Sequence, residues 1–378
     1  MDKRNLKSIG KDISLLGFGC MRLPIKNDNT EDIDFQTGQE MVDTAIHAGV
    51  NYFDTAWGYH GGKSELFIGE ALKKYNRDSF YLATKMPTWD ILESIETAED
   101  IFNKQLERCQ VEYFDFYLAH NVTADTYPRV QNFKLYDFLH KKREQGFIRH
   151  LGFSFHDNCE LFEKVLNDYE WEFSQIQLNY IDWTVTNAKR QYELITKKGI
   201  PVIVMEPVRG GSLASLNQEA LDIFKSADLK RSPASWALRF AASLPNVMTV
   251  LSGMSTTDQV IDNINTFSNF TSLTDYEHQV ILKAATSYNS SRFIPCTACC
   301  YCMKCPFGIN IPRAFSIFNL YKSTGNRISF RNNNRTLTES EKAHNCTGCG
   351  ACLSKCPQKI DIPKNMKEIA DFTDTLFS

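Results

Sequence analysis

The sequence predicts an α/β protein, a parallel (β/α)₈ barrel of the TIM type followed by a small cysteine-rich domain. Strand-like runs alternate with helix-like segments through residues 1–290, which is the order expected of such a barrel. A doubly wound open sheet is the alternative, but no G-x-G-x-x-G motif follows the first strand. Nine of the twelve cysteines lie in residues 291–378, which we expect to form a separate domain.

The eight predicted strands are short runs rich in β-branched and aromatic residues, bounded by turn or polar residues. They cover residues 13–19, 51–56, 80–85, 114–120, 148–154, 173–178, 201–206 and 247–253. Between them, apolar residues recur at three- and four-residue steps, as on one face of a helix, in segments 38–49, 64–75 and 93–109. One more helix is expected over 272–290. The pattern changes past Arg292, so we place the domain boundary near residue 290.

The composition favours a folded protein, with 43% hydrophobic and 23% charged residues. A net charge of -3 indicates neither nucleic-acid nor membrane-surface binding. The longest apolar run, "IPVIVM" at residues 200–205, is too short to cross a bilayer, and the start of the chain is polar. We therefore expect a cytoplasmic protein. In that compartment clustered cysteines indicate metal or redox chemistry more often than disulfides.

The cysteines of the tail form two groups. The second has the C-x₂-C-x₂-C-x₃-C-P spacing of a bacterial 4Fe-4S motif and comprises Cys346, Cys349, Cys352 and Cys356. The first is one residue shorter at its last step and comprises Cys296, Cys299, Cys302 and Cys305. Zinc is the alternative occupant, because C-x₂-C pairs also bind it. A zinc site needs only four ligands, however, and does not require the repeated group of three cysteines followed by Cys-Pro. Cys300 departs from the pattern and is interpreted as a spectator.

The cysteine module is duplicated. Residues 305–315 and 356–366 share Cys-Pro, Ile-x-Ile-Pro and a following helical segment, the layout of a two-cluster ferredoxin. We therefore expect a ferredoxin-like iron–sulfur domain with two 4Fe-4S clusters. In such domains the Cys-Pro cysteine of each run serves the other run's cluster. The shorter first run leaves open the alternative that it closes on its own cluster.

Four polar residues fall at successive strand ends of the predicted barrel, where barrel enzymes place their chemistry. They are Asp54, Tyr59, Lys85 and His120, within "FDTAWGY", "ATK" and "LAH". This set resembles the catalytic tetrad of the aldo-keto reductases. The resemblance covers roughly residues 1–285 and includes "GFGCMRLP", "GFSFH" and "ALRFAASLP".

The chemistry agrees with the resemblance. Carbonyl reduction needs a hydride donor and a proton donor to the developing alkoxide. A free tyrosine is a poor acid, but an ammonium ~4 Å away stabilises its phenolate by about 4 kcal/mol at an effective dielectric of 20. We therefore expect the charge of Lys85 to lower the pKa of Tyr59, by an amount that desolvation of the phenolate reduces. Asp54 would hold Lys85 charged, and His120 would orient the carbonyl oxygen.

The resemblance also implies a nicotinamide dinucleotide, NADP or NAD, held without a glycine fingerprint. The residues it assigns to the dinucleotide are Ser154, Gln175, Met205, Pro207, Gly210, Gly211, Leu213, Gly253, Met254, Ser255, Thr257, Gln259 and Asn263. Ser154 and Gln175 would bind the carboxamide. Residues 207–213 would fold over the pyrophosphate, and residues 251–265 would bind the adenosine phosphate.

Three departures from the family pattern stand out. Met205 replaces an aromatic residue that stacks on the nicotinamide in the family. Residues 251–265 contain no Lys or Arg for a 2′-phosphate, so we expect weak discrimination or a preference for NAD. Phe155 and His156 replace the usual polar pair after the fifth strand. We interpret His156 as a histidine at the rim of the site.

The sequence therefore predicts an NAD(P)-dependent carbonyl reductase or alcohol dehydrogenase acting on a small molecule. The alternative is a redox-sensing or electron-carrying protein whose barrel only binds nucleotide. We expect the clusters to transfer electrons, with an electron-transfer protein as partner. The second hypothesis is that they stabilise the C-terminal domain, which has few large apolar residues. The third is that they sense redox state. Cys20, Cys109 and Cys159 are expected to be inert core thiols.

Overall fold

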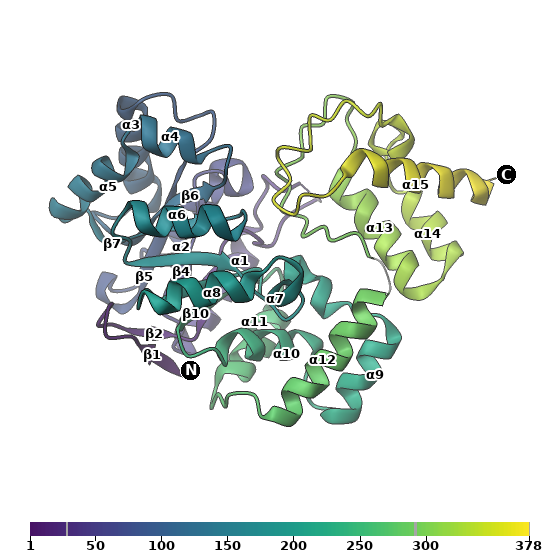
Figure 1. Ribbon diagram of the computed structural model, residues 1–378, viewed down its shortest axis with the longest axis horizontal. Helices are drawn as coiled ribbons and strands as arrows, with labels where there is room; N and C mark the ends of the chain where they lie inside the picture. Colours follow the sequence, from purple (N-terminus) through teal and green to yellow (C-terminus); the bar gives the residue numbers. More distant parts are fainter. Residues whose placement is uncertain (28, 291–292, 378) are drawn as a thin grey trace. The chain divides into compact units, whose positions relative to one another are not determined.

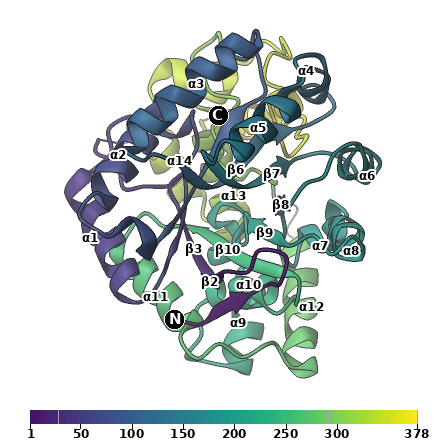
Figure 2. The ribbon, with the colours of Figure 1, turned by 90° about the vertical axis from the view of Figure 1, so that its left-hand side faces the viewer.

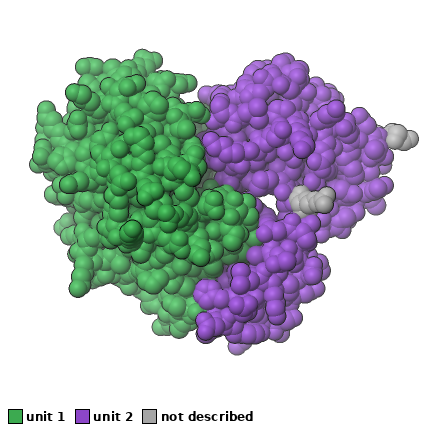
Figure 3. Space-filling view, viewed as in Figure 1, with its two compact units in different colours: residues 1–207, 237–273 green, residues 208–236, 274–378 purple. Residues whose placement is uncertain are grey.

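The computed structural model describes residues 1–27, 29–290 and 293–377. By internal contacts it divides into two compact units, which Figure 3 colours separately. Unit 1 comprises residues 1–207 and 237–273, and unit 2 comprises residues 208–236 and 274–378. The boundary expected near residue 290 falls beside Ser291 and Arg292, which lie outside the described residues.

Unit 1 contains a closed barrel of parallel strands, which confirms the predicted fold class (Figures 1 and 2). The strands are β3 (Leu16–Gly19), β4 (Tyr52–Asp54), β5 (Tyr81–Pro87), β6 (Phe114–Val122), β7 (Ile148–Phe155), β8 (Phe173–Gln177), β9 (Val202–Met205) and β10 (Val247–Gly253). They pair in chain order, and β10 closes the barrel on β3 with Leu251 opposite Gly17. A methyl group at Gly17 would lie 2.6 Å from Cδ2 of Leu251, so glycine leaves room for the Leu251 side chain at this closure.

The helices of unit 1 surround the strands, as Figure 2 shows for α1, α3, α5 and α6. The helices are α1 (Phe35–His47), α2 (Lys63–Leu72), α3 (Ile95–Cys109), α4 (Tyr127–Asn132), α5 (Leu135–Glu144), α6 (Cys159–Asp168), α7 (Asp182–Val185), α8 (Ala188–Lys197) and α11 (Thr257–Phe267), with single turns η1 (Tyr59–Gly62) and η2 (Arg77–Ser79). In α3, Ser94 caps the first turn by accepting a hydrogen bond from the amide of Thr97. The buried face of α3 repeats at three- and four-residue steps, through Ala98, Ile101, Phe102, Gln105 and Cys109.

The run predicted as one strand over residues 13–19 is divided in the structure. Its start belongs to β2 (Asp12–Ser14), which pairs antiparallel with β1 (Lys3–Asn5). Ile9 and Ile13 of this hairpin are buried with Tyr52 and Phe116 in one apolar cluster of the barrel strands. The hairpin thereby extends the barrel core, an element that the sequence pattern did not predict.

Unit 2 is helical in the described residues. Its helices are α9 (Gln218–Ala227), α12 (Asp275–Ser290), α13 (Ile311–Thr324), α14 (Arg327–Asn334) and α15 (Ile362–Phe377), with single turns η3 (Arg209–Ala214), η4 (Glu339–Glu341) and η5 (Ala343–Asn345). Helix α10 (Pro233–Ala242) contributes residues to both units. α9 packs on α12, where Asn217 Nδ2 donates a hydrogen bond of 3.0 Å to the carbonyl oxygen of Ser287.

The cysteine-rich part of unit 2 has an apolar core of its own. Its fully or nearly buried side chains include Phe315, Phe318, Phe330, Met366 and Ile369. Tyr321 and Phe372 stack beside them with ring centroids 4.4 Å apart. The expectation of a tail with few large apolar residues is therefore wrong, because the aromatic residues of α13, α14 and α15 meet in one cluster. Among the described residues, no helix has the length and apolar composition to cross a bilayer.

Candidate functional site

The four residues of the predicted tetrad lie on three neighbouring strands of the barrel and in the turn that follows one of them. Asp54 is the last residue of β4, and Tyr59 begins the turn η1 that follows it. Lys85 lies near the end of β5, and His120 pairs in register with Pro87 at the end of that strand. All four side chains are buried. The carboxyl ends of β4, β5 and β6 therefore bring these four residues to one end of the barrel.

Lys85 is the centre of the hydrogen-bond network. Its ammonium donates to Oδ1 of Asp54 at 2.6 Å and to the carbonyl oxygen of Thr55 at 2.7 Å. It also donates to the phenol oxygen of Tyr59 at 3.3 Å. A charged group with three protein acceptors and no solvent exposure is held in one orientation. The network therefore presents the Tyr59 hydroxyl with a fixed positive charge beside it.

A second buried layer supports Lys85 from behind. Gln105 of α3 donates to the backbone carbonyl of Lys85 at 3.1 Å and to the carboxylate of Glu65 at 2.6 Å. Thr84 also donates to Glu65, at 2.7 Å. The attraction of the Glu65 charge favours the ammonium form of Lys85. This layer fixes the position of the lysine and adds a second carboxylate that favours its charge.

Burial dominates the acid–base properties of the site. It raises the pKa of Tyr59 well above its ordinary value, and the negative charges of Asp54 and Glu206 add to that rise. Burial likewise raises the pKa of Asp54 and lowers that of Lys85, while their mutual attraction opposes both shifts. On balance the pKa of Tyr59 is therefore raised, because desolvation of the phenolate outweighs the favourable charge of the nearby ammonium. Tyr59 is a neutral phenol with a proton to give.

His120 is buried between aromatic rings. Its ring lies edge-on to Tyr59 at 5.9 Å and to Trp89 at 5.2 Å between centroids. Burial lowers the pKa of His120 well below its ordinary value, and the positive charges of Lys85 and His156 lower it further. Nδ1 of His120 has no hydrogen-bond partner among the described residues. A neutral imidazole with an unused nitrogen can bind a substrate oxygen at this site.

Trp89 and His156 extend the surroundings of the tetrad. Trp89 lies two residues after the end of β5. The sequence analysis did not select it, although residues just after strand ends are candidates for the site of a barrel. His156 follows β7 directly and is half-buried, which fits the interpretation of a rim histidine. Phe155 is buried instead against Phe162 of α6, at 4.9 Å between ring centroids. Phe155 is therefore part of the core.

The residues assigned to the nicotinamide lie at the ends of the next strands. Ser154 of β7 and Gln175 of β8 pair in register and are both buried. The hydroxyl oxygen of Ser154 accepts a hydrogen bond of 2.8 Å from the amide of Asn121, so its own proton is free to be donated. Oε1 of Gln175 is buried with no partner in the described part of the chain. A hydroxyl donor and an unused amide acceptor fit the two ends of a carboxamide.

Met205 and Pro207 follow on β9 and just after it. The thioether sulfur of Met205 lies 3.6 Å from Nε2 of Gln175. The strand ends at Met205, and Pro207 is the last residue of the first segment of unit 1. Met205 therefore offers a polarisable thioether beside Gln175 where the family pattern has a ring.

The segment assigned to the adenosine phosphate forms the end of β10 and the start of α11. Asn263 donates to Ser252 at 2.9 Å, and the amide of Ser255 donates to Gln259 at 2.8 Å. Thr257 is the first residue of α11, and Met254 is buried. The α11 helix starts here with a side-chain cap, in which the Thr256 hydroxyl accepts a hydrogen bond from the amide of Gln259.

Arg22 is a basic residue close to this segment, and sequence reasoning missed it. A methyl group at Gly253 would lie 2.9 Å from Cγ of Arg22, and the Ser255 hydroxyl donates at 2.8 Å to the carbonyl of Arg22. The charge of Arg22 also acts on Tyr59 and His60. Its position just after β3 could have identified it, because the functional residues of a barrel lie at and after the carboxyl ends of the strands.

The remaining dinucleotide assignments belong to unit 2. Gly210, Gly211 and Leu213 lie in the turn η3, whose two glycines have φ values of 63° and 91°. Leu213 is buried, and its amide donates to the carbonyl of Val208 at 3.1 Å. Their role at the pyrophosphate stays a prediction from the sequence pattern.

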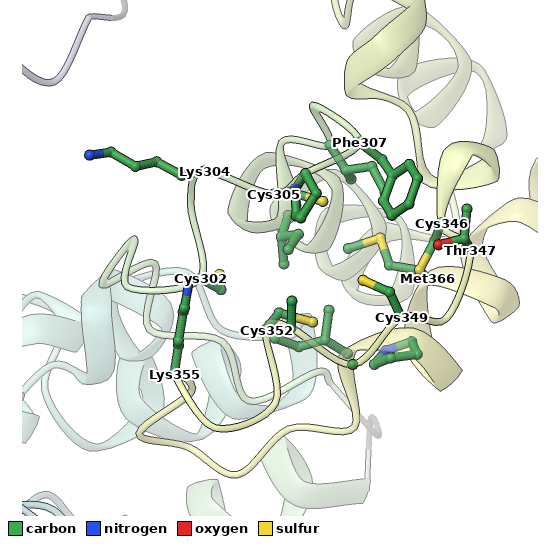
Figure 4. A pocket seen from close by; sticks show the side chains of 17 residues that line it. Cys302, Lys304, Cys305, Phe307, Cys346, Thr347, Cys349, Cys352, Lys355 and Met366 are labelled. Carbon is green, nitrogen blue, oxygen red and sulfur yellow. The ribbon is translucent and has the colours of Figure 1, made fainter. Parts of the chain in front are cut away.

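The cysteines of unit 2 line two cavities. One cavity is lined by side chains that include Cys302, Cys305, Cys346, Cys349 and Cys352. Figure 4 shows the thiols of Cys305, Cys349 and Cys352 pointing into it. Burial raises the pKa of Cys352, and the nearby thiols that add to this rise are those of Cys346, Cys305 and Cys349.

The second cavity is lined mainly by cysteines of the first run, and it shares Cys302 with the first cavity. Its cysteines are Cys296, Cys299, Cys300, Cys302 and Cys356. Burial raises the pKa of Cys302, and the thiols that add to this rise are, in order, those of Cys299, Cys296, Cys356 and Cys300. Each cavity therefore includes three cysteines of one run and the Cys-Pro cysteine of the other, and Cys302 lines both cavities. This is the crossed membership that the duplicated motif predicts, and ligation itself stays a prediction.

These cavities fit a multi-iron cluster. Five cysteines line each cavity, which is enough for a 4Fe-4S cluster that takes one thiolate on each of its four irons. In residues 1–27, 29–290 and 293–377, no group of three or more His, Cys, Asp or Glu side chains has the geometry to hold a single metal ion.

The remaining cysteines differ in exposure. Cys20 and Cys109 are buried, as expected of core thiols, and burial raises the pKa of each. Cys159 is only half-buried, so the expectation of a core thiol is wrong there. Cys300 is exposed and lines the second cavity, which the interpretation as a spectator did not anticipate.

Comparison with known proteins agrees with this geometry. Residues 15–285 match the model of the Aldo/keto reductase family, and residues 295–360 match that of the 4Fe-4S dicluster domain. A probable aldo-keto reductase 1 of Glycine max is 33% identical over 153 residues, which are 38% of this chain and 42% of that protein. The uncharacterized oxidoreductase YqkF of Bacillus subtilis (strain 168) is 25% identical over 299 residues, 70% of this chain and 90% of its own length.

A solved structure shares the barrel. The aldo-keto reductase AKR11C1 from Bacillus halodurans, in its holo form, superposes with a TM-score of 0.64 and 27% identity, over 75% of this chain and 96% of its own. Barrel and tail together define an oxidoreductase with an appended iron–sulfur domain. The chain belongs to the aldo/keto reductase family, and its C-terminal part is a 4Fe-4S dicluster domain.

Proposed function

We propose that the protein is an NAD(P)-dependent carbonyl reductase, or in reverse an alcohol dehydrogenase, that carries two 4Fe-4S clusters. The observation that carries this proposal is the buried network of Lys85, Asp54 and Tyr59, with His120 beside it. A sensor that only binds nucleotide has no need for a phenol held against a buried ammonium. A nicotinamide, when bound, supplies or accepts the hydride.

The residues of the chain perform the proton chemistry. Tyr59 gives the proton of its hydroxyl to the carbonyl oxygen as that oxygen becomes an alkoxide. Lys85, 3.3 Å from the phenol oxygen, stabilises the phenolate that remains. His120, neutral and with Nδ1 unused by the described residues, holds the substrate oxygen near Tyr59. The oxygen gains a proton and the carbon a hydride, which balances the reduction of a carbonyl to an alcohol.

The dinucleotide is proposed to bind along the ends of β7 to β10 in unit 1. Ser154 offers a donor and Gln175 an acceptor to the carboxamide, while the start of α11 offers amides to a phosphate. Gly210, Gly211 and Leu213 remain assigned by the sequence pattern alone. We propose ligation by Cys296, Cys299, Cys302 and Cys356 for one cluster, and by Cys346, Cys349, Cys352 and Cys305 for the other.

For the clusters we propose electron transfer to a partner that works in single-electron steps. The apolar core around Phe318 and Phe330 supports this role, because the domain does not depend on metal alone for its interior. The cysteine usage suits a reducing compartment, and we propose the cytoplasm as the location.

The test is turnover under anaerobic conditions. Loss of NADH or NADPH absorbance is followed with a panel of aldehydes and ketones, for the wild type and for Lys85→Met. Lys74→Met is the control, because Lys74 is an exposed lysine that also pairs with an aspartate, Asp43. The proposal expects turnover that Lys85→Met abolishes and Lys74→Met keeps. Binding of dinucleotide without turnover of any carbonyl favours the sensor.

A further inference from the structure

Gly210 touches the backbone of the first cysteine run within unit 2. A methyl group built on Gly210 would lie 2.2 Å from the carbonyl oxygen of Thr297 and 2.6 Å from its Cα. Real side chains do not approach backbone this closely, so glycine at 210 is what allows the two segments to meet. The contact joins the turn η3 to the run that begins at Cys296.

Thr297 belongs to the wall of a cysteine cavity. It stands between Cys296 and Cys299, and all three line the cavity that Cys302 and Cys356 complete. Thr297 is 2% exposed. A change in charge or position at this cavity therefore acts on the backbone that Gly210 touches.

The turn η3 is braced internally. The amides of Gly211 and Leu213 donate to the carbonyl of Val208 at 3.0 and 3.1 Å, and the Ser212 hydroxyl donates to the carbonyl of Arg209 at 2.8 Å. Arg209, Gly210 and Gly211 all have positive φ values, which glycine adopts without strain and other residues adopt rarely. A displacement at Gly210 therefore shifts the turn as a unit.

We infer that Thr297 is a positioning residue for the dinucleotide, and that it couples the cluster held by Cys296, Cys299, Cys302 and Cys356 to pyrophosphate binding by the turn 209–214. This inference rests on the proposed function, which assigns Gly210 and Gly211 to the pyrophosphate. Coupling between two sites is reciprocal. The redox state of this cluster changes the affinity for the pyrophosphate group, and the bound pyrophosphate changes the reduction potential of the cluster by the same factor.

The test uses ADP-ribose and its 2′-phosphate, which carry the pyrophosphate but no nicotinamide and so exchange no electrons with the protein. Their dissociation constants are measured for the full chain with both clusters, oxidised and then reduced. We expect a difference of about tenfold between the two states, which for a one-electron couple corresponds to a shift of about 59 mV in the potential of one cluster. Equal affinities in both states overturn the inference.

The chain offers a matched pair of variants. Gly210→Ala and Gly211→Ala both replace a glycine of positive φ in the same turn, but a methyl group at Gly211 meets nothing within 4 Å. We expect Gly210→Ala to change the paramagnetic resonance spectrum of one reduced cluster without ligand and to reduce the coupling below twofold. Gly211→Ala is expected to alter affinity while keeping the wild-type spectrum and coupling. Identical behaviour of the two variants contradicts the inference.

The outcomes also separate this inference from the function on which it rests. If neither ADP-ribose, its 2′-phosphate, NAD nor NADP binds, the nucleotide-dependent function fails together with the coupling. If these nucleotides bind and carbonyls are reduced, but the dissociation constants are the same with oxidised and reduced clusters, only the coupling fails. The wild-type measurement needs no variant to fold.

Discussion

The ammonium of Lys85 lies 2.6 Å from Oδ1 of Asp54, and neither side chain has appreciable exposure to solvent. Breaking a buried ion pair leaves an uncompensated charge, so the pair persists only where its geometry is held from several sides. Here the carbonyl of Thr55 and the phenol of Tyr59 complete the set of acceptors around the ammonium. The ion pair therefore holds the positive charge of Lys85 next to the Tyr59 hydroxyl.

Replacing Tyr59 by phenylalanine removes the proposed acid. We expect the variant to lose at least ~10²-fold in turnover, the usual contribution of a general acid, because it lacks the hydroxyl that Lys85 contacts. Dinucleotide affinity is expected to persist. Steady-state kinetics and fluorescence quenching measure the two effects.

Tyr81→Phe is the control for removing a phenol from the same barrel. Tyr81 begins β5, at the opposite end of the strand from Lys85. It is expected to keep normal turnover. Near-normal turnover of Tyr59→Phe would show that the tetrad assignment is wrong.

The pH dependence should differ between the two directions of reaction. Reduction needs the neutral phenol, and burial, Asp54 and Glu206 raise the pKa of Tyr59, so its proton is retained as the pH rises through the neutral range. The rate of reduction is therefore expected to be flat from about pH 6 to about pH 9, below the ordinary tyrosine pKa of about 10. Alcohol oxidation needs the phenolate and should accelerate over the same range. A rate of reduction that falls between about pH 7 and about pH 9 contradicts the pKa direction.

The preference between NAD and NADP tests whether the lack of a basic residue in residues 251–265 weakens binding of the 2′-phosphate. Because residues 251–265 contain no Lys or Arg, we expect NAD and NADP to bind within about tenfold of each other, or NAD to bind more tightly. Fluorescence titration with both nucleotides measures this. A hundredfold preference for NADP would contradict the prediction. Arg22→Gln would then show whether the arginine that packs on Gly253 is responsible.

Crossed ligation predicts which cluster responds to a lost thiol. Cys305 lines the cavity of Cys346, Cys349 and Cys352, so Cys305→Ser should perturb the cluster of that run in paramagnetic resonance of the reduced protein. Cys300→Ser is the matched control, because it removes a thiol of the first run that lines only the other cavity. A Cys305→Ser variant that disturbs only the cluster of residues 296–302 refutes crossed ligation.

The barrel could be predicted because its strands and helices have different periods of apolar residues. The eight strands lie within two residues of their expected ends, apart from the first, where the run 13–19 is divided between β2 and β3. The hairpin of β1 and β2 could not be foreseen. Its burial of Ile9 and Ile13 comes from tertiary contacts with Tyr52 and Phe116, which local pattern does not encode.

The candidate site was predictable where residue type and strand end coincide, as for Lys85 and His120. The pKa direction of Tyr59 was not, since it depends on how completely the phenol is desolvated. Arg22 was missed because it approaches Gly253 across the barrel closure, from the other end of the sequence. The contact of Gly210 with Thr297 is equally non-local.

The central claim is hydride transfer between a nicotinamide and a carbonyl carbon, with the proton supplied by Tyr59. The most direct measurement follows deuterium from nicotinamide dinucleotide labelled at C4, using the full chain with its clusters under anaerobic conditions. The account predicts one deuterium on the carbinol carbon of the product alcohol, transferred from one face of the nicotinamide, and no such product with Tyr59→Phe at matched times. An alcohol that carries hydrogen from solvent on that carbon, or labelled nucleotide that stays unconsumed with every carbonyl offered, would contradict it.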